Sequence, residues 1–233
     1  MCTVSLVPVA DGCRVVCNRD ERRARPAALP PRAWPTEASW ATYPQDPVSG
    51  GTWIGVNDDG LVVALLNRTT SPGGEGSPRL SRGSIVPALL ACASLDRAVL
   101  AARALDGRDF EPFELVMVQR SVVAVIAGDS LETARVSPLA RPVMFTSSSL
   151  GDAIVEAPRR TLFEELVVAS DDWLSGQFQF HRHQWGDRPE ISVQMARDDA
   201  ATVSRTTIDV TSRTIDLEYE SLTARPRSIS AAA

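Results

Sequence analysis

Cys2 directly follows the initiator methionine, and its small side chain is of the kind that permits removal of Met1. Removal would leave a free α-amine, with an ordinary pKa of about 8, on the same residue as the thiol. An amine that titrates close to neutral pH is a competent general base for its own side chain. The chain start therefore predicts a nucleophile and a base on one residue. The plainer alternative is a buried thiol that acts as a small apolar residue.

The position of Cys2 is informative because a predicted hairpin returns the chain to it. Two apolar segments flank Asp11 and Gly12, a dipeptide typical of tight hairpin turns. With these two residues as the loop, Arg19 lies across from Val4, on the face that also carries Cys2. A guanidinium on that face favours the thiolate and lowers the pKa of the thiol.

Asp20 extends this candidate site, since the same register places it across from Thr3 at the start of the first strand. Its carboxylate is expected to hold or orient the ammonium form of the terminal amine. The alternative for Arg19 and Asp20 is an ion pair that closes a strand end.

The elements that would position these residues form one α+β domain over residues 1–227, with a disordered tail at 228–233. A second hairpin surrounds the turn at 57–60, and the proline-rich segment 25–50 is predicted to be a long ordered loop. Helices are predicted at 84–93, 94–105 and 158–169. Further strands are predicted at 113–119, 121–128, 191–196, 202–210 and 213–220.

A set of short motifs is spread over the first 90 residues: the Met-Cys start, Asn18-Arg19-Asp20-Glu21 with Arg25-Pro26, Gly50-Gly51-Thr52-Trp53-Ile54-Gly55, the run to Asn67, and Ser81-Arg82-Gly83. Together they resemble the NRDE family, also called the Transport and Golgi organisation 2 group. The resemblance implies the N-terminal-nucleophile hydrolase fold, which is a four-layer αββα sandwich. Within that superfamily the chain looks most similar to the penicillin V acylase and bile salt hydrolase branch, which cleaves amide bonds.

The resemblance implies catalytic roles, by motif position, for Cys2, Arg19, Asp20, Asn67 and Arg205. Of these, Cys2 is the expected nucleophile and Asn67 the expected oxyanion donor. The residues expected to contact the substrate are Asn18, Trp53 and Ser148. The hydrolase branch has an asparagine in the strand that here carries serines at 147–149, and loss of one oxyanion donor typically costs about 10²–10³-fold in rate.

The predicted function is an N-terminal cysteine hydrolase that acts on an amide or thioester of a hydrophobic acyl group after removal of Met1. A hydrophobic substrate is favoured by the tryptophans at 34, 40 and 53. The alternative is a non-catalytic binding or trafficking protein that holds a lipid, an acyl-CoA or haem in the same cleft. The hydrolase needs no cofactor.

The composition argues against several other classes of function. All 24 basic residues are scattered arginines and the net charge is −5, which argues against a nucleic-acid surface. The chain shows no leader and no apolar stretch long enough for a membrane span, so a cytoplasmic protein is expected. The four cysteines lack the spacing of a disulfide framework. Neither Cys13 with Cys17 nor His181 with His183 has the further ligands that a metal site needs. Nothing in the pattern indicates the oligomeric state.

Overall fold

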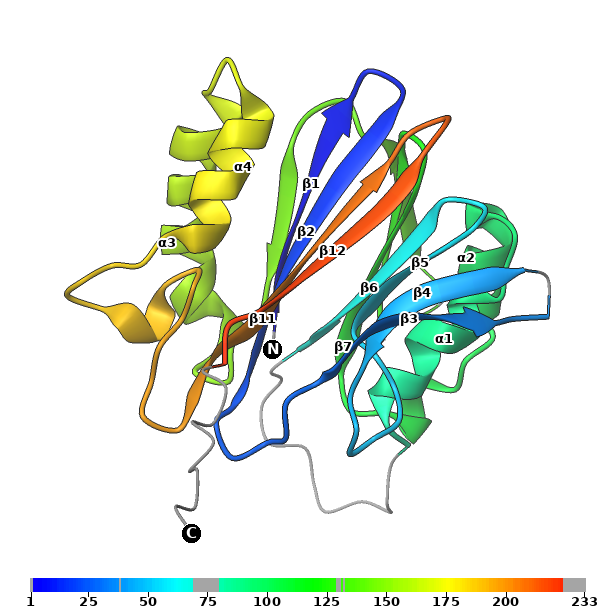
Figure 1. Cartoon of the computed structure of the whole chain (residues 1–233), viewed down its shortest axis with the longest axis horizontal. Helices are drawn as coiled ribbons and strands as arrows, with labels where there is room; N and C mark the ends of the chain where they lie inside the picture. The colour runs from blue at the N-terminus through cyan, green and yellow to red at the C-terminus, as the bar shows by residue number, and fades with distance from the viewer. Residues whose placement is uncertain (1, 38, 69–79, 129–130, 132, 224–233) are drawn as a thin grey trace, which may run out of the picture.

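Two antiparallel sheets pack face to face, and helices cover the outer side of each sheet, so that the chain forms four layers (Figure 1). This is a computed structural model, and it describes residues 2–37, 39–68, 80–128, 131 and 133–223. Helices α3 (Asp152–Phe163) and α4 (Trp173–Arg182) cover one sheet. Helices α1 (Ile85–Leu90) and α2 (Leu95–Arg103) cover the other. The predicted αββα sandwich is confirmed, whereas the predicted tail at 228–233 lies outside the described residues.

Sheet A, on the side of α3 and α4, has the strand order β10-β1-β2-β11-β12. Its strands are β1 (Cys2–Val9), β2 (Gly12–Arg22), β10 (Val143–Thr146), β11 (Ala200–Val210) and β12 (Ile215–Ser221). Sheet B follows the chain order β3-β4-β5-β6-β7-β8-β9. Its strands are β3 (Leu29–Pro35), β4 (Trp40–Gln45), β5 (Ile54–Asn57), β6 (Leu61–Asn67), β7 (Phe113–Gln119), β8 (Val122–Ala127) and β9 (Ala134–Pro138).

The two faces of sheet A differ in chemistry, because side chains alternate along each strand. The face toward sheet B is mainly apolar and includes Val4, Leu6 and Val15. The face toward α3 and α4 buries Thr3, Ser5, Asn18 and Asp20 among the apolar residues of a smaller core. In sheet B, by contrast, both faces of β6 are buried and apolar, as expected for a strand covered on both sides.

The first hairpin has a register two residues away from the prediction. Cys2, and not Val4, lies across from Arg19, and the turn is formed by residues 10 and 11. Gly12 already belongs to β2, where a Cβ atom would lie 1.9 Å from the carbonyl oxygen of Val210. The glycine thus permits close packing against β11 and does not form the turn. A shift of two residues keeps every side chain on its face, so the prediction that Cys2 and Arg19 share a face is confirmed.

Other elements also differ from the predictions. Segment 25–50 contains β3 and β4, and the prolines of β3 are tolerated because β3 is an edge strand of sheet B. Helix α3 begins at Asp152 and not at Pro158, and it continues as a π-helical turn over Glu164–Val168. Segment 191–196 forms no regular strand, and α4 was not predicted at all. The remaining short 3₁₀ turns are η1 (Arg82–Ser84), η2 (Gly107–Asp109) and η4 (Pro189–Ile191). Within the described part of the chain, no helix has the length and apolar character needed to cross a membrane.

Candidate active site

A cavity of about 350 Å³ opens at the end of the sheets where β1 begins, and both sheets line it. Sheet A contributes Cys2 and Arg19, which lie directly opposite each other on β1 and β2. Trp53, just before β5, and Asn67, the last residue of β6, contribute from the other sheet. Three of the expected catalytic residues and one expected substrate contact therefore lie around one cavity.

The thiol of Cys2 is buried, and its environment favours the thiolate. A hydrogen bond from the Cys17 thiol lowers the pKa of Cys2, burial opposes this effect, and the charge of Arg19 adds to it. The same hydrogen bond and burial raise the pKa of Cys17 well above its usual range. Burial raises the pKa of Cys13 to about 12 and also raises that of Cys92. Cys2 is thus the one cysteine of the four that is biased toward the nucleophilic form.

Ser147, and not Ser148, lies beside Cys2. The backbone nitrogen of Cys2, which would become the α-amine after removal of Met1, donates a hydrogen bond to Ser147 Oγ at 3.3 Å. The Ser147 amide donates in turn to the Cys2 carbonyl at 3.0 Å, which extends the pairing of β10 with β1. Ser148 faces away, and its hydroxyl accepts a hydrogen bond from Arg197 Nη2.

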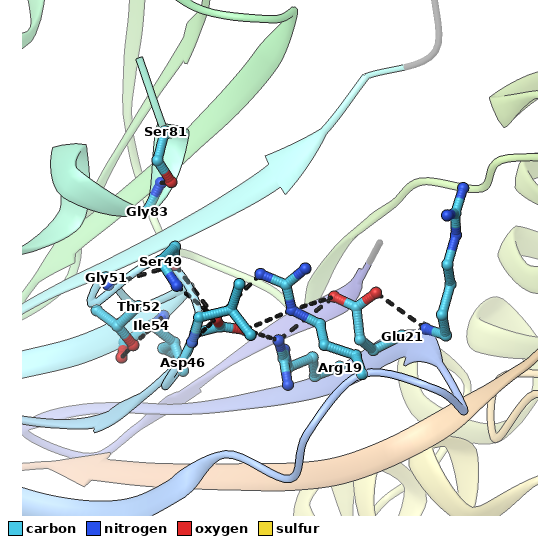
Figure 2. A network of polar contacts seen from close by, with 12 residues as sticks. Arg19, Glu21, Asp46, Ser49, Gly51, Thr52, Ile54, Ser81 and Gly83 are labelled. Carbon is cyan, nitrogen blue, oxygen red and sulfur yellow. Dashed lines mark hydrogen bonds and ion pairs between the residues drawn. The ribbon is translucent and has the colours of Figure 1, made fainter. Parts of the chain in front are cut away.

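The guanidinium of Arg19 is fixed by a carboxylate that the sequence analysis missed (Figure 2). Arg19 Nη2 donates to Asp46 Oδ2 at 2.5 Å and to Glu21 Oε2 at 3.3 Å. Its guanidinium carbon lies 4.3 Å from the ring centroid of Trp53, which is a cation–π contact. Asp46 also accepts two hydrogen bonds from Arg25. The carboxylates of Asp46 and Glu21 and the ring of Trp53 therefore together set the position of the Arg19 guanidinium.

Asp46 is itself held by the loop that leads toward β5. Its Oδ1 accepts hydrogen bonds from the backbone amides of Val48 and Ser49 at 3.0 Å (Figure 2). Burial opposes ionisation, but the hydrogen bonds from Arg25 and Ser49 and the charge of Arg19 keep the pKa of Asp46 well below its usual range. An aspartate at the start of a Pro-Val-Ser-Gly-Gly turn is the sequence signal that marks this residue.

Asn67 ends β6, where it lies across from Phe113 of β7. Its side chain is half-buried and makes no hydrogen bond to any residue that the structure describes. Asn67 lines the Cys2 cavity and also a second cavity of about 510 Å³ that reaches β8, β10 and α3. An amide donor between two cavities has the chemistry needed to bind an oxyanion.

Asn18 and Arg205 do not lie in the cavity, because alternate residues of β2 and β11 face α4. Asn18 Nδ2 donates to the carbonyl oxygens of His181 and Val193 at 2.8 and 3.0 Å. Arg205 donates to Asn18 Oδ1 and forms an ion pair with Glu220 at 2.6 Å. Both side chains thus join sheet A to its helix layer and lie outside the Cys2 cavity, so the expected substrate contact of Asn18 and the expected catalytic role of Arg205 stay predictions that this placement does not support.

The side chain of Asp20 also points from β2 toward the helices, away from the face that carries Arg19. Burial raises the pKa of Asp20, while the charge of Arg159 and a hydrogen bond from the Thr202 hydroxyl at 2.6 Å oppose this effect. Asp20 nevertheless acts on the site, because its charge raises the pKa of Cys2. Its expected role toward the terminal amine stays a prediction.

A polar layer surrounds these residues between sheet A and the helices. Arg159 of α3 is fully buried and donates to the hydroxyls of Thr3 and Thr146 and to two backbone carbonyls. His181 of α4 lies between the Ser5 hydroxyl and Asn18 Oδ1, at 2.7 and 3.2 Å. Burial and the nearby arginines hold the pKa of His181 well below its usual range, so the ring is neutral. No cluster of three metal-ligating side chains occurs among the described residues.

A comparison with known protein families identifies the family of this chain. The family model described as Transport and Golgi organisation 2 matches residues 14–179, which is more than half of the chain. The chain belongs to the Transport and Golgi organisation 2 family. No curated protein sequence matches it significantly.

Solved structures place this family member in the N-terminal-nucleophile hydrolase fold. A Caenorhabditis elegans N-acylethanolamine-hydrolyzing acid amidase ortholog is 14% identical, with a TM-score of 0.57, over 88% of this chain and 92% of that chain. Penicillin V acylase from Agrobacterium tumefaciens is also 14% identical, with a TM-score of 0.52, over 95% and 86%. A variant of conjugated bile acid hydrolase from Clostridium perfringens is 10% identical, with a TM-score of 0.51, over 95% and 92%. At these identities the likeness concerns the fold.

Proposed function

We propose that the protein is an N-terminal cysteine hydrolase that cleaves an amide, or a thioester, of a hydrophobic acyl group after Met1 has been removed. One observation carries the proposal: the Cys2 thiol, whose pKa is lowered, lines the same cavity as the side-chain amide of Asn67, which binds none of the described residues. A nucleophile and an oxyanion donor around one space are the minimum for acyl transfer. The names of the structural neighbours, an amidase, an acylase and a bile acid hydrolase, agree with this class of reaction.

The first half-reaction forms an acyl-enzyme. The α-amine of Cys2 accepts the thiol proton, and the sulfur attacks the carbonyl carbon of the substrate. The electron pair of the C=O bond moves to the oxygen, where Asn67 Nδ2 donates a hydrogen bond. When the carbonyl forms again the C–N bond breaks, and the ammonium group returns its proton to the leaving nitrogen. An amine departs and a thioester to Cys2 remains.

The second half-reaction restores the enzyme. A water molecule loses a proton to the same α-amine and attacks the thioester carbonyl carbon. The C–S bond then breaks, the ammonium group returns the proton to the sulfur, and a carboxylic acid leaves. Arg19 favours the thiolate throughout, because Asp46 and Trp53 keep its guanidinium beside the cavity. Ser147 Oγ accepts a hydrogen bond from the Cys2 backbone nitrogen, and the same contact would orient the amine toward the sulfur once Met1 is removed.

The test begins with the intact mass of the purified protein, because every step above needs a free amino terminus on Cys2. Turnover of a panel of acyl amides and thioesters is then compared between the parent, a Cys2→Ala variant and a Cys92→Ala control. Cys92 is a half-buried thiol outside the cavity. Loss of turnover in Cys2→Ala alone is expected. A retained Met1, or equal turnover in the Cys2→Ala variant, would rule out the hydrolase and favour the non-catalytic binding protein.

A further inference from the structure

The two cavities that meet at Asn67 differ in charge. The 510 Å³ cavity is lined by four arginines and four acidic residues, so the charges of its lining cancel. Its apolar side chains include Val123, Val125 and Phe145. The 350 Å³ cavity is lined by four arginines and only two carboxylates, so its lining has an excess of two positive charges. A substrate that spans both cavities would place an apolar part in the first and an anionic part in the second.

Arg82 is the guanidinium of the smaller cavity that remains available to an anion. Arg19 and Arg25 are both engaged by Asp46 and Glu21, and Arg22 is exposed at the rim. Arg82 is half-buried, and Nη1 donates to the Pro112 carbonyl at 2.7 Å. The charge of Glu111 acts on Arg82, but among the described residues no carboxylate forms an ion pair with it, and Nε and Nη2 donate to none of them.

The backbone that carries Arg82 is held in place by close contact with the loop before β5. The amide of Thr52 donates to the Gly83 carbonyl at 3.0 Å. A Cβ atom on Gly51 would lie 2.3 Å from that carbonyl group, so only glycine permits this approach. The Gly50-Gly51 and Ser81-Arg82-Gly83 motifs therefore act together, and they fix the guanidinium on the wall of the cavity.

We propose that Arg82 binds a carboxylate on the amine half of the substrate, while the apolar acyl half occupies the larger cavity. Two guanidinium donors that bind no described residue match a carboxylate in a bidentate pair. The substrate class is then an N-acyl amino carboxylate, with the amide bond beside Asn67 and Cys2. The cleavage of that bond rests on the proposed function, whereas the binding preference does not.

The experiment measures binding by calorimetry to the full-length Cys2→Ala protein, which cannot turn over the ligand. N-decanoylglycine and its neutral analogue N-decanoylglycinamide are the matched probes. We expect N-decanoylglycine to bind about tenfold more tightly, since a hydrogen-bonded charge pair is involved. Introducing Arg82→Gln should abolish the preference, Arg82→Lys should keep only part of it, and Arg103→Gln, an exposed position on α2, should leave it unchanged.

The outcomes separate this inference from the proposed function. An equal affinity for the two probes in the Cys2→Ala protein, failure to bind either probe, or a preference that survives Arg82→Gln would overturn it. Thermal melting of each variant identifies a loss of fold, in which case the Arg82→Lys result decides. If the preference depends on Arg82 but the active protein hydrolyses neither probe, the inference stands and the hydrolase proposal for this substrate class fails.

Discussion

Replacement of Asp46 by asparagine is expected to destabilise the protein by about 2–3 kcal/mol. The Asp46 side chain is 6% exposed and binds both Arg19, which is equally buried, and Arg25, which is one-third exposed. Removal of one partner from a fully buried ion pair costs about 3–5 kcal/mol, because an unpaired charge is left behind. The exposure of Arg25 and the open cavity reduce this cost, since water can solvate part of the freed charge.

A matched control is the pair between Arg14 and Asp209, in which both side chains are about one-third exposed (31% and 33%) and neither is fully buried. Both pairs are bidentate contacts to an arginine, with distances of 2.7 Å and 2.9–3.0 Å. Because water screens this partly exposed pair, Asp209→Asn is expected to cost no more than about 1 kcal/mol. The free energy of unfolding is measured for both variants by urea denaturation at pH 7.

The pH dependence supplies a second readout for Asp46. An unfolded aspartate binds its proton with a pKa of about 3.9, whereas the pKa of folded Asp46 lies well below this value. Below about pH 4 the unfolded chain therefore binds more protons, and the stability that Asp46 provides is lost as the pH falls toward its folded pKa. The Asp46→Asn variant should therefore lose less unfolding free energy than the parent as the pH falls below about 4. Equal costs for Asp46→Asn and Asp209→Asn, or an unchanged acid profile, would refute the reasoning.

Three further predictions concern single side chains. Cys2 should react with iodoacetamide at pH 7 faster than Cys92, because a neighbouring thiol lowers the pKa of Cys2 and burial raises that of Cys92; equal labelling in peptide mass maps would contradict this. Asn67→Ala should lower kcat by about 10²–10³-fold with little change in unfolding midpoint, and a loss under tenfold would remove its oxyanion role. Lowering the pH from 7 should reduce the unfolding free energy by up to about 1.4 kcal/mol per unit, because the unfolded histidine binds a proton below about pH 6.5 and buried His181 does not. Urea titrations should show this loss in His183→Asn but not in His181→Asn, and identical slopes in the two variants would contradict it.

The sequence predicted the site where the information was local. The alternation of side chains along the first hairpin placed Cys2 and Arg19 on one face. The predicted strand register was nevertheless wrong by two residues. The reason lies outside the hairpin, since Gly12 is required by the close approach of Val210. A contact with a strand nearly 200 residues away leaves no local signal.

The residues that complete the site were harder to predict, because they come from distant segments. Asp46 lies in a proline-rich stretch whose strands are defined only by their pairing within sheet B. Only the pairing of β10 with β1 shows that Ser147, and not Ser148, lies beside Cys2. Motif position placed Arg205 in the site, whereas the pairing of β11 with β2 turns its side chain toward α4.

The alternation along β2 divides the Asn18–Glu21 string between two tasks. Arg19 and Glu21 reach the cavity, whereas Asn18 and Asp20 reach the buried layer that attaches the helices. One tetrapeptide thus supplies two side chains to the cavity and two to the layer that supports it. Substitutions at neighbouring positions of this string would therefore have different effects: a changed cavity in an intact fold at one position, and weakened attachment of the helix layer at the next.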